Sequence, residues 1–136
     1  MMLAALVFSM AMQMAAPAPF QTVARDMTSN FVEPQQMVVR TADEWKALWS
    51  QHAFGDAPKV DFASRTAVVV FLGTRTSGGF SVEFLATRES QGVLTVQWRE
   101  RRPDRGAITA QVMTSPMHAA TIPKFAGEIR FEKAEK

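Results

Sequence analysis

The side chains that could do chemistry in this sequence are few, and their spacing does not assemble a catalytic site. Ser115 and His118 could act as a nucleophile and its base, but residues three apart in a strand point to opposite faces. Asp61 and Glu83 could act as an acid–base pair, but nothing in the sequence fixes their separation. The sequence therefore favours a protein that is not an enzyme, and a small hydrolase is the most distant alternative.

The sequence indicates no metal or cofactor. His52 and His118 are the only histidines, and neither has a second histidine or a carboxylate at the spacing of a metal-binding helix. The chain has no cysteine, so it can form neither a disulfide nor a thiolate metal site. We therefore expect no cofactor, and a fold that is stabilised by packing.

The composition argues for one domain and against a nucleic-acid partner. The 136 residues include 15 basic and 13 acidic side chains, so the net charge is only +2. Proteins that are held mainly by phosphate contacts carry a much stronger positive field. Hydrophobic residues make up 47% of the chain, which is enough for one core, and no change in composition marks a second domain.

The first residues resemble a secretion signal. An uncharged apolar stretch runs from Leu3 to Ala16 and is too short to span a bilayer comfortably. Ala16 and Ala18 then provide the small-residue spacing that signal peptidase prefers, whereas the alternative is a buried N-terminal helix. We expect a signal peptide over residues 1–19, a single domain over residues 20–136, and a periplasmic or secreted protein with no stable membrane insertion after the signal is removed.

The elements that would position a site begin with an apolar strand and the loop that follows it. Residues 68–72 have no polar face, so this strand should lie in the middle of a sheet that is covered on both sides. Gly78 and Gly79 can adopt positive φ values, which lets the loop turn sharply or approach another molecule closely. A loop held on a rigid strand is a common place for recognition.

This glycine loop is the candidate binding surface, together with the nearby loops that contain Pro103 and Pro116. Arg75 is the charged side chain of the loop, and the alternative is that it is simply solvated beside a tight turn. The predicted binding residues are Arg75, Thr76, Ser77, Gly78, Gly79, Phe80, Pro103, Ser115 and Pro116.

An arginine cluster lies at the end of a later strand. It consists of Arg99, Arg101, Arg102 and Arg105. Glu100 interrupts the cluster, so the pattern favours a solvated outer strand face over a site for an anion or an acidic protein.

A helix is expected immediately after Thr41. Thr41 can cap it while Glu44 reaches back to the amide of the capping residue, and Gly55 is a suitable end. The residues on its apolar face are Trp45, Leu48, Trp49 and His52.

Alternating patterns predict the remaining strands. They are expected at residues 20–31 as an edge strand, 36–40, 80–87, 94–99, 109–113, 118–122 and 127–131. A three-residue loop over residues 90–92 would place Phe84 opposite Trp98 and Glu83 opposite Arg99. Pro116 should lie at a bulge or an edge. We therefore expect a mainly β (α+β) fold, a small antiparallel β-sandwich or half-barrel with one packed α-helix.

Taken together, these stretches resemble the PrcB-like domain family, which is named for a subunit of a bacterial surface protease complex. The matching stretches are residues 42–49, 58–62, 68–80 and 114–116. The family has tyrosine after the paired glycines and after the late proline, where this chain has Phe80 and Met117. The resemblance implies a small, exported, non-catalytic bacterial protein that associates with a protease or another envelope protein.

A second, shorter likeness gives the alternative function. Residues 74–80 distantly resemble the threonine–glycine loop of chagasin-type cysteine protease inhibitors, which insert loops of a β-sandwich into an active-site cleft. The expected function is therefore binding to a protein or peptide, and the alternative is inhibition of an extracytoplasmic protease.

Overall fold

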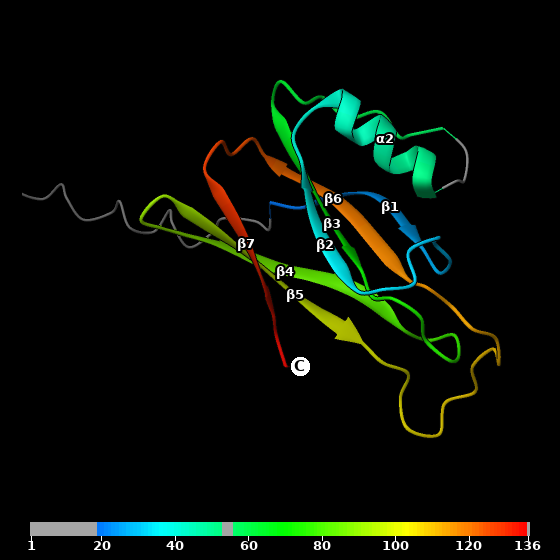
Figure 1. Cartoon of the computed structure of the whole chain (residues 1–136). Coiled ribbons are helices and arrows are strands. Elements are labelled where there is room, and N and C mark those ends of the chain that lie inside the picture. Colours follow the sequence, from blue (N-terminus) through cyan, green and yellow to red (C-terminus); the bar gives the residue numbers. More distant parts are fainter. Residues whose placement is uncertain (1–18, 53–55, 136) are drawn as a thin grey trace, which may run out of the picture.

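The computed structural model describes residues 19–52 and 56–135, and they form three layers: one helix, a four-stranded sheet and a three-stranded sheet (Figure 1). The expected signal peptide lies outside the described residues except for Pro19. Within the described ranges, no helix is long and apolar enough to cross a membrane.

The four-stranded sheet is antiparallel throughout. Its strands, in spatial order, are β1 (Gln21–Asp26), β6 (Met117–Pro123), β3 (Arg65–Phe71) and β2 (Gln35–Val39). The apolar strand predicted from the sequence is β3, which lies between β6 and β2 as expected. The edge strand predicted over residues 20–31 corresponds to β1, which is shorter than predicted. Its position at the edge of the sheet is confirmed.

The three-stranded sheet consists of β4 (Ser81–Ser90), β5 (Val93–Arg101) and β7 (Glu128–Lys133). The β4–β5 pair is an antiparallel hairpin, whereas β7 runs parallel to β5. The parallel pair arises because the chain crosses to the other sheet as β6 between these two strands.

Both faces of β3 are buried, which explains why this strand has no polar face. Val69 and Phe71 belong to the cluster that packs under the helix. Val68 and Val70 face the other way and pack in the clusters that contain residues of β4, β5 and β7. The structure is therefore a β-sandwich with one packed helix, as predicted, and it is not a closed barrel.

The helix α2 (Ala42–His52) begins at Thr41, whose Oγ1 accepts the Glu44 amide at 3.2 Å. Glu44 Oε1 accepts the amide of Arg40 at 2.9 Å, so the returning bond reaches one residue further back than predicted. Trp45, Leu48 and Trp49 are buried as expected. The predicted end at Gly55 and the side chain of His52 lie outside the described parts of the chain.

The hairpin has the predicted pairs but reaches them by another route. Phe84 lies opposite Trp98 and Glu83 opposite Arg99. The predicted three-residue loop is wrong: the turn has two residues, Gln91 and Gly92, with φ values of 52° and 79°. A bulge between Phe84 and Ala86 restores the register, because it adds the one residue that the shorter turn omits.

The predicted strand over residues 109–113 is wrong, because the chain between β5 and β6 is a loop. An isolated β-bridge joins Thr114 of this loop to Arg75. Pro116 does not lie at an edge or a bulge. It is buried immediately before β6, a strand inside the sheet, and its carbonyl accepts the Leu72 amide at 2.9 Å. Proline fits there because β6 begins only at the next residue.

Replacement of Trp49 tests the packing of the helix on the sheet. The Trp49→Ala variant should lose about 3 to 5 kcal/mol of unfolding free energy, because a large side chain that is only 7% exposed leaves a cavity. Denaturant unfolding measures the loss. The exposed neighbour gives the control, since Ser50→Ala should change the unfolding free energy by less than about 0.5 kcal/mol. Equal midpoints for the Trp49→Ala variant and the wild type would contradict the packed helix.

Candidate functional site

Three loops gather at one end of the sandwich, and we call this region the loop end (Figure 1). They are residues 27–34, 72–80 and 102–116. Backbone hydrogen bonds join them: Gly78 donates to Ala110 at 2.9 Å, Thr74 donates to Val32 at 3.1 Å, and residues 75 and 114 exchange two bonds. Their backbones therefore hold one another in place.

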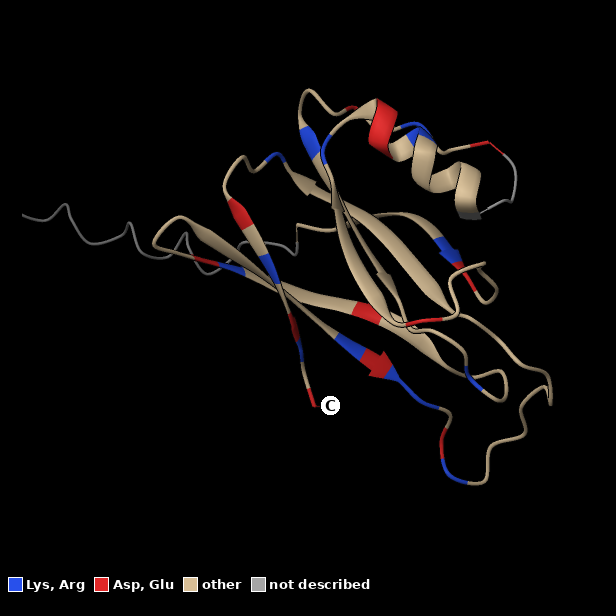
Figure 2. Cartoon of the chain, viewed as in Figure 1, with Lys and Arg blue, Asp and Glu red and all other residues tan. Residues whose placement is uncertain are grey.

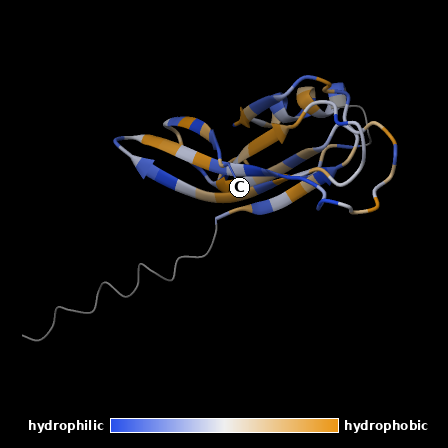
Figure 3. Ribbon diagram, turned by 90° about the horizontal axis from the view of Figure 1, so that it is seen from below, coloured by the Kyte–Doolittle hydropathy of each residue, from blue (hydrophilic) through white to orange (hydrophobic). Residues whose placement is uncertain are grey.

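The loop end carries the exposed large hydrophobic side chains of the described residues. These are Met27, Val32, Ile108, Val112 and Met113. Ile108 is fully exposed and Met113 is 70% exposed. Figure 3 shows hydrophobic segments on these loops, away from the strands. Exposed apolar side chains on loops that hydrogen bond to one another make the loop end a candidate surface for another molecule.

Arg75 belongs to the base of the loop end and is not a freely solvated contact residue. Its Nε and Nη2 donate to the two carboxylate oxygens of Glu100 at 2.8 and 3.1 Å. Its Nη1 donates to the carbonyls of Leu72 and Thr74, and its guanidinium carbon lies 5.8 Å from the centre of the Phe80 ring. Arg75 therefore links the loop after β3 to β5 of the other sheet.

The partner of Arg75 is a nearly buried carboxylate. The Glu100 side chain is only 4% exposed and also receives Lys133 Nζ at 3.3 Å. The hydrogen bond from Arg75 holds the pKa of Glu100 below its usual value of 4.5, although burial acts in the opposite direction. The same bond raises the pKa of Arg75. Glu100 therefore does more than interrupt an arginine run.

The two loop glycines have different roles. Gly78 is buried and has no positive φ, whereas Gly79 has a φ of 94°. A β-carbon on Gly79 would lie 2.9 Å from Pro103 and 3.0 Å from Thr109, so the close approach that glycine permits is to the chain's own loop. Gly73, which the sequence did not single out, also has a positive φ, 82°, against Pro34.

The other predicted site residues are distributed between the surface and the interior. Thr76 is exposed, while Ser77 and Phe80 are half-buried. Pro103 is half-buried against Gly79, and Ser115 and Pro116 are buried. The structure thus brings the predicted loops together, but several predicted residues support the surface from below.

Ser115 and His118 do not form a nucleophile–base pair. His118 Nδ1 donates to the Val82 carbonyl at 2.9 Å, so its Nε2 accepts the Thr22 hydroxyl at 2.8 Å in the neutral ring. Both ring nitrogens are therefore occupied by other residues. Burial lowers the pKa of His118 below 6.5 and favours this neutral form.

The two carboxylates that could have formed an acid–base pair have separate local partners. Asp61 accepts the amide of Ala63 and the hydroxyl of Ser64 in a turn. Glu83 accepts from Arg99 at 2.6 Å, as the hairpin register predicted. Among residues 19–52 and 56–135, no group of three or more His, Cys, Asp and Glu residues could hold a metal ion.

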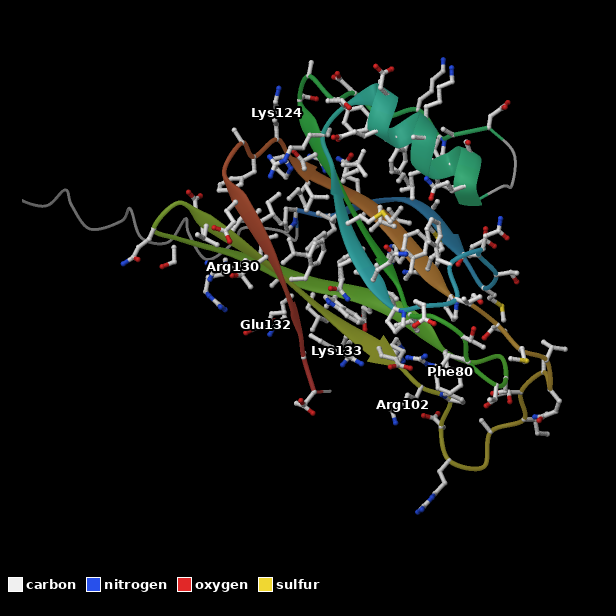
Figure 4. All side chains as sticks on the ribbon, in the orientation of Figure 1. Phe80, Arg102, Lys124, Arg130, Glu132 and Lys133 are labelled. Carbon is white, nitrogen blue, oxygen red and sulfur yellow. The ribbon has the colours of Figure 1, made fainter. Side chains whose placement is uncertain are left out.

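The arginine cluster divides into paired and exposed members. Arg99 and Arg101 both contact Glu83 across the hairpin, which agrees with the solvated strand face favoured by the sequence. Arg102 and Arg105 are exposed beyond the end of β5. Figure 4 labels Arg102 there, and Figure 2 shows further basic segments on the loop that follows. Arg102 and Arg105 therefore stand at the start of the loop that carries Ile108.

The comparison with known families gives a match over the middle of the chain. Residues 66–123 match the PrcB C-terminal family. The resemblance seen in the sequence is thereby confirmed for this PrcB-like segment, which runs from β3 to β6 and includes two of the three loops of the loop end. No curated protein and no solved structure matches the chain.

Sequence reasoning missed the apolar side chains of the loop end. The stretch between Pro103 and Pro116 contains Ile108, Val112 and Met113. The sequence pattern predicts a strand over residues 109–113, so it does not place these side chains on an exposed loop. The signal that could have revealed them is the absence of a regular alternation together with Gly106 and the flanking prolines, which is typical of a long loop.

Loss of the Arg75 guanidinium should destabilise the fold. The Arg75→Ala variant should lose about 2 kcal/mol of unfolding free energy at neutral pH, because it leaves the nearly buried Glu100 carboxylate with only Lys133. Chemical denaturation measures the difference from the wild type. The exposed Arg102→Ala variant is the matched control and should unfold like the wild type.

The difference in unfolding free energy between the wild type and Arg75→Ala should depend on pH. Because the pKa of folded Glu100 is below 4.5, its stabilising contribution is complete above that pH and is lost as the pH falls through the folded pKa. The difference in unfolding free energy between the wild type and Arg75→Ala should therefore decrease in this acid range. A difference that stayed constant there would show that the stabilisation by Arg75 does not depend on ionised Glu100.

Proposed function

We propose that this chain is an exported, non-catalytic binding domain that attaches to a protein partner through the loop end. The observation that carries the proposal is the group of exposed apolar side chains on loops that are tied together by backbone hydrogen bonds. A surface that is already ordered loses little conformational entropy on binding, which favours affinity. The two methionines add side chains that adapt easily to an apolar partner surface.

The partner that the family suggests is a protein of the cell envelope. The PrcB-like segment contains the loops of residues 72–80 and 102–116. The resemblance to a family named for a protease-complex subunit supports an accessory role in an envelope protease complex. The near-neutral charge balance of the chain supports a protein partner over nucleic acid.

The surroundings of the two candidate catalytic residues, Ser115 and His118, support binding over catalysis. The candidate base His118 is 3% exposed and has both ring nitrogens occupied, and the candidate nucleophile Ser115 is itself buried. A catalytic pair needs a nucleophile within hydrogen-bond reach of its base and open to substrate. We therefore propose that the chain positions or recognises a protein and leaves the chemistry to its partner.

Exposed carboxylates placed in the loop end test this function. The double variant Ile108→Glu and Met113→Glu should lose its envelope partner, because burial of two charges in an apolar contact is unfavourable. Its unfolding midpoint should stay close to the wild type, because both side chains are exposed. Photo-crosslinking from position 112, followed by identification of the linked protein in the native envelope, measures the contact.

The matched control lies at the other end of β4. Ser90→Glu adds an exposed charge at the hairpin tip and should retain the partner. Equal crosslinking of the wild type and the double variant would contradict the proposal that the loop end is the binding surface. If the linked protein is a protease, titration of its activity separates the two candidate roles: an inhibitor blocks it at near-stoichiometric ratio, and an accessory subunit does not.

Export is tested by the N-terminus of the protein recovered from its native cell. The apolar stretch of residues 3–16 and the small residues after it predict cleavage, so the mature protein should begin between Pro17 and Ala24 and lie outside the cytoplasm. N-terminal sequencing and cell fractionation measure both features. Recovery of the intact chain from Met1 would contradict the proposed export.

A further inference from the structure

A groove lies between the helix α2 and β2, and none of its lining residues belongs to the loop end. Figure 1 shows α2 beside β2, the edge strand of its sheet. Its volume is about 320 Å³. The residues that line it are Met37, Val38, Val39, Glu44, Ala47, Leu48 and Gln51. Most of these side chains are apolar, and the two polar ones that can make strong contacts lie on the helix.

The backbone of β2 is open on the groove side. β2 is the last strand of its sheet and pairs with β3 along its whole length, from Gln35 to Val39. No other strand of the described residues pairs with it. An edge strand presents a row of amide and carbonyl groups that another extended chain can satisfy. The groove therefore combines a hydrogen-bonding edge with an apolar wall.

The helix supplies that wall without filling the space next to the strand. Leu48 is buried against the sheet, and the neighbouring Ala47 is exposed and ends at its methyl group. Met37 and Val39 of β2 pack in the same cluster as the buried helix residues. Val39 is buried there, but Met37 is only half-buried. An edge strand beside a helix is the arrangement in which an extended peptide adds a strand and places alternate side chains in pockets.

The charge at one end of the groove defines the occupant further. Glu44 Oε1 accepts the Arg40 amide, and no ion pair joins Glu44 to a cation of the described residues. The adjacent guanidinium of Arg40 is directed to the carbonyls of Phe125 and Gly127 and does not neutralise this carboxylate. A cation on the incoming chain would complement Glu44.

We propose that this groove binds an extended, mainly apolar peptide segment of a partner protein as an added strand on β2, with a lysine or arginine of that segment next to Glu44. Backbone hydrogen bonds to β2 give affinity, and the apolar wall selects alternate side chains. The site uses other residues than the loop end, so the two proposals can fail separately.

Selection from a phage-displayed library of random dodecapeptides on the purified chain tests the site. The expected peptides have alternating β-branched residues and a lysine or arginine at one end, because they must pair as strands. Their binding should be abolished by Ala47→Arg, which fills the groove and places a cation three residues from Glu44 on the same helix face. The Ser50→Arg variant, on the same helix outside the groove, should bind them like the wild type.

Further variants separate the parts of the proposal. Glu44→Gln keeps an acceptor for the Arg40 amide and should weaken peptides with a terminal cation by about tenfold, without affecting peptides that lack it. The Ile108→Glu and Met113→Glu variant should bind the selected peptides normally. Selection of no peptide, of helical patterns, or of peptides whose affinity is unchanged by Ala47→Arg would overturn the proposal. Methylation of the peptide amides that face β2, which are every second amide of the strand, should also abolish binding because it removes the donors that pair with β2.

Discussion

The ion pair between Arg75 and Glu100 is the interaction on which the loop end depends. It joins the loop after β3 to β5, so it adds a side-chain link between the two sheets at the end where the loops of residues 72–80 and 102–116 also pass from one sheet to the other. A carboxylate that is 4% exposed is tolerated only with compensating donors, and Arg75 supplies two of them. The backbone of the same residue is bonded to Thr114, so one arginine sets the positions of two loops. The exposed apolar side chains are displayed on that base.

Local patterns made much of the fold predictable from the sequence. The apolar run of β3, the cap and buried tryptophans of α2 and the alternation of the hairpin each depend on residues that are close along the chain. The partner of Arg75 is 25 positions away and follows from the tertiary arrangement, so this residue was predicted as an exposed contact. The expected pairs of the hairpin were right because a shorter turn and a bulge compensated each other. The assignment of residues 109–113 failed because an apolar stretch on a loop has the same composition as a strand.

The family match and the two proposed surfaces divide the molecule. Residues 66–123 include the ion pair and two of the three loops of the loop end, so the base of the loop end belongs to the PrcB-like segment. The helix and β2, which form the groove, precede that segment, and β7 follows it. A loop-end surface together with a separate strand–helix edge would allow one chain to contact two segments of a partner at once. Simultaneous contacts raise the effective affinity without enlarging either surface.

The parallel pairing of β7 with β5 has a consequence for how the molecule assembles. The chain leaves β5, crosses the four-stranded sheet as β6 and returns to the three-stranded sheet only for its last strand. β7 therefore pairs with a strand that lies about 35 positions earlier in the chain, as in the pair Val93 and Glu128. This closure of contacts between distant parts of the chain slows folding relative to a meander of hairpins. It also couples the two layers, so that neither sheet is complete as an independent unit and both are expected to form and melt in one cooperative transition.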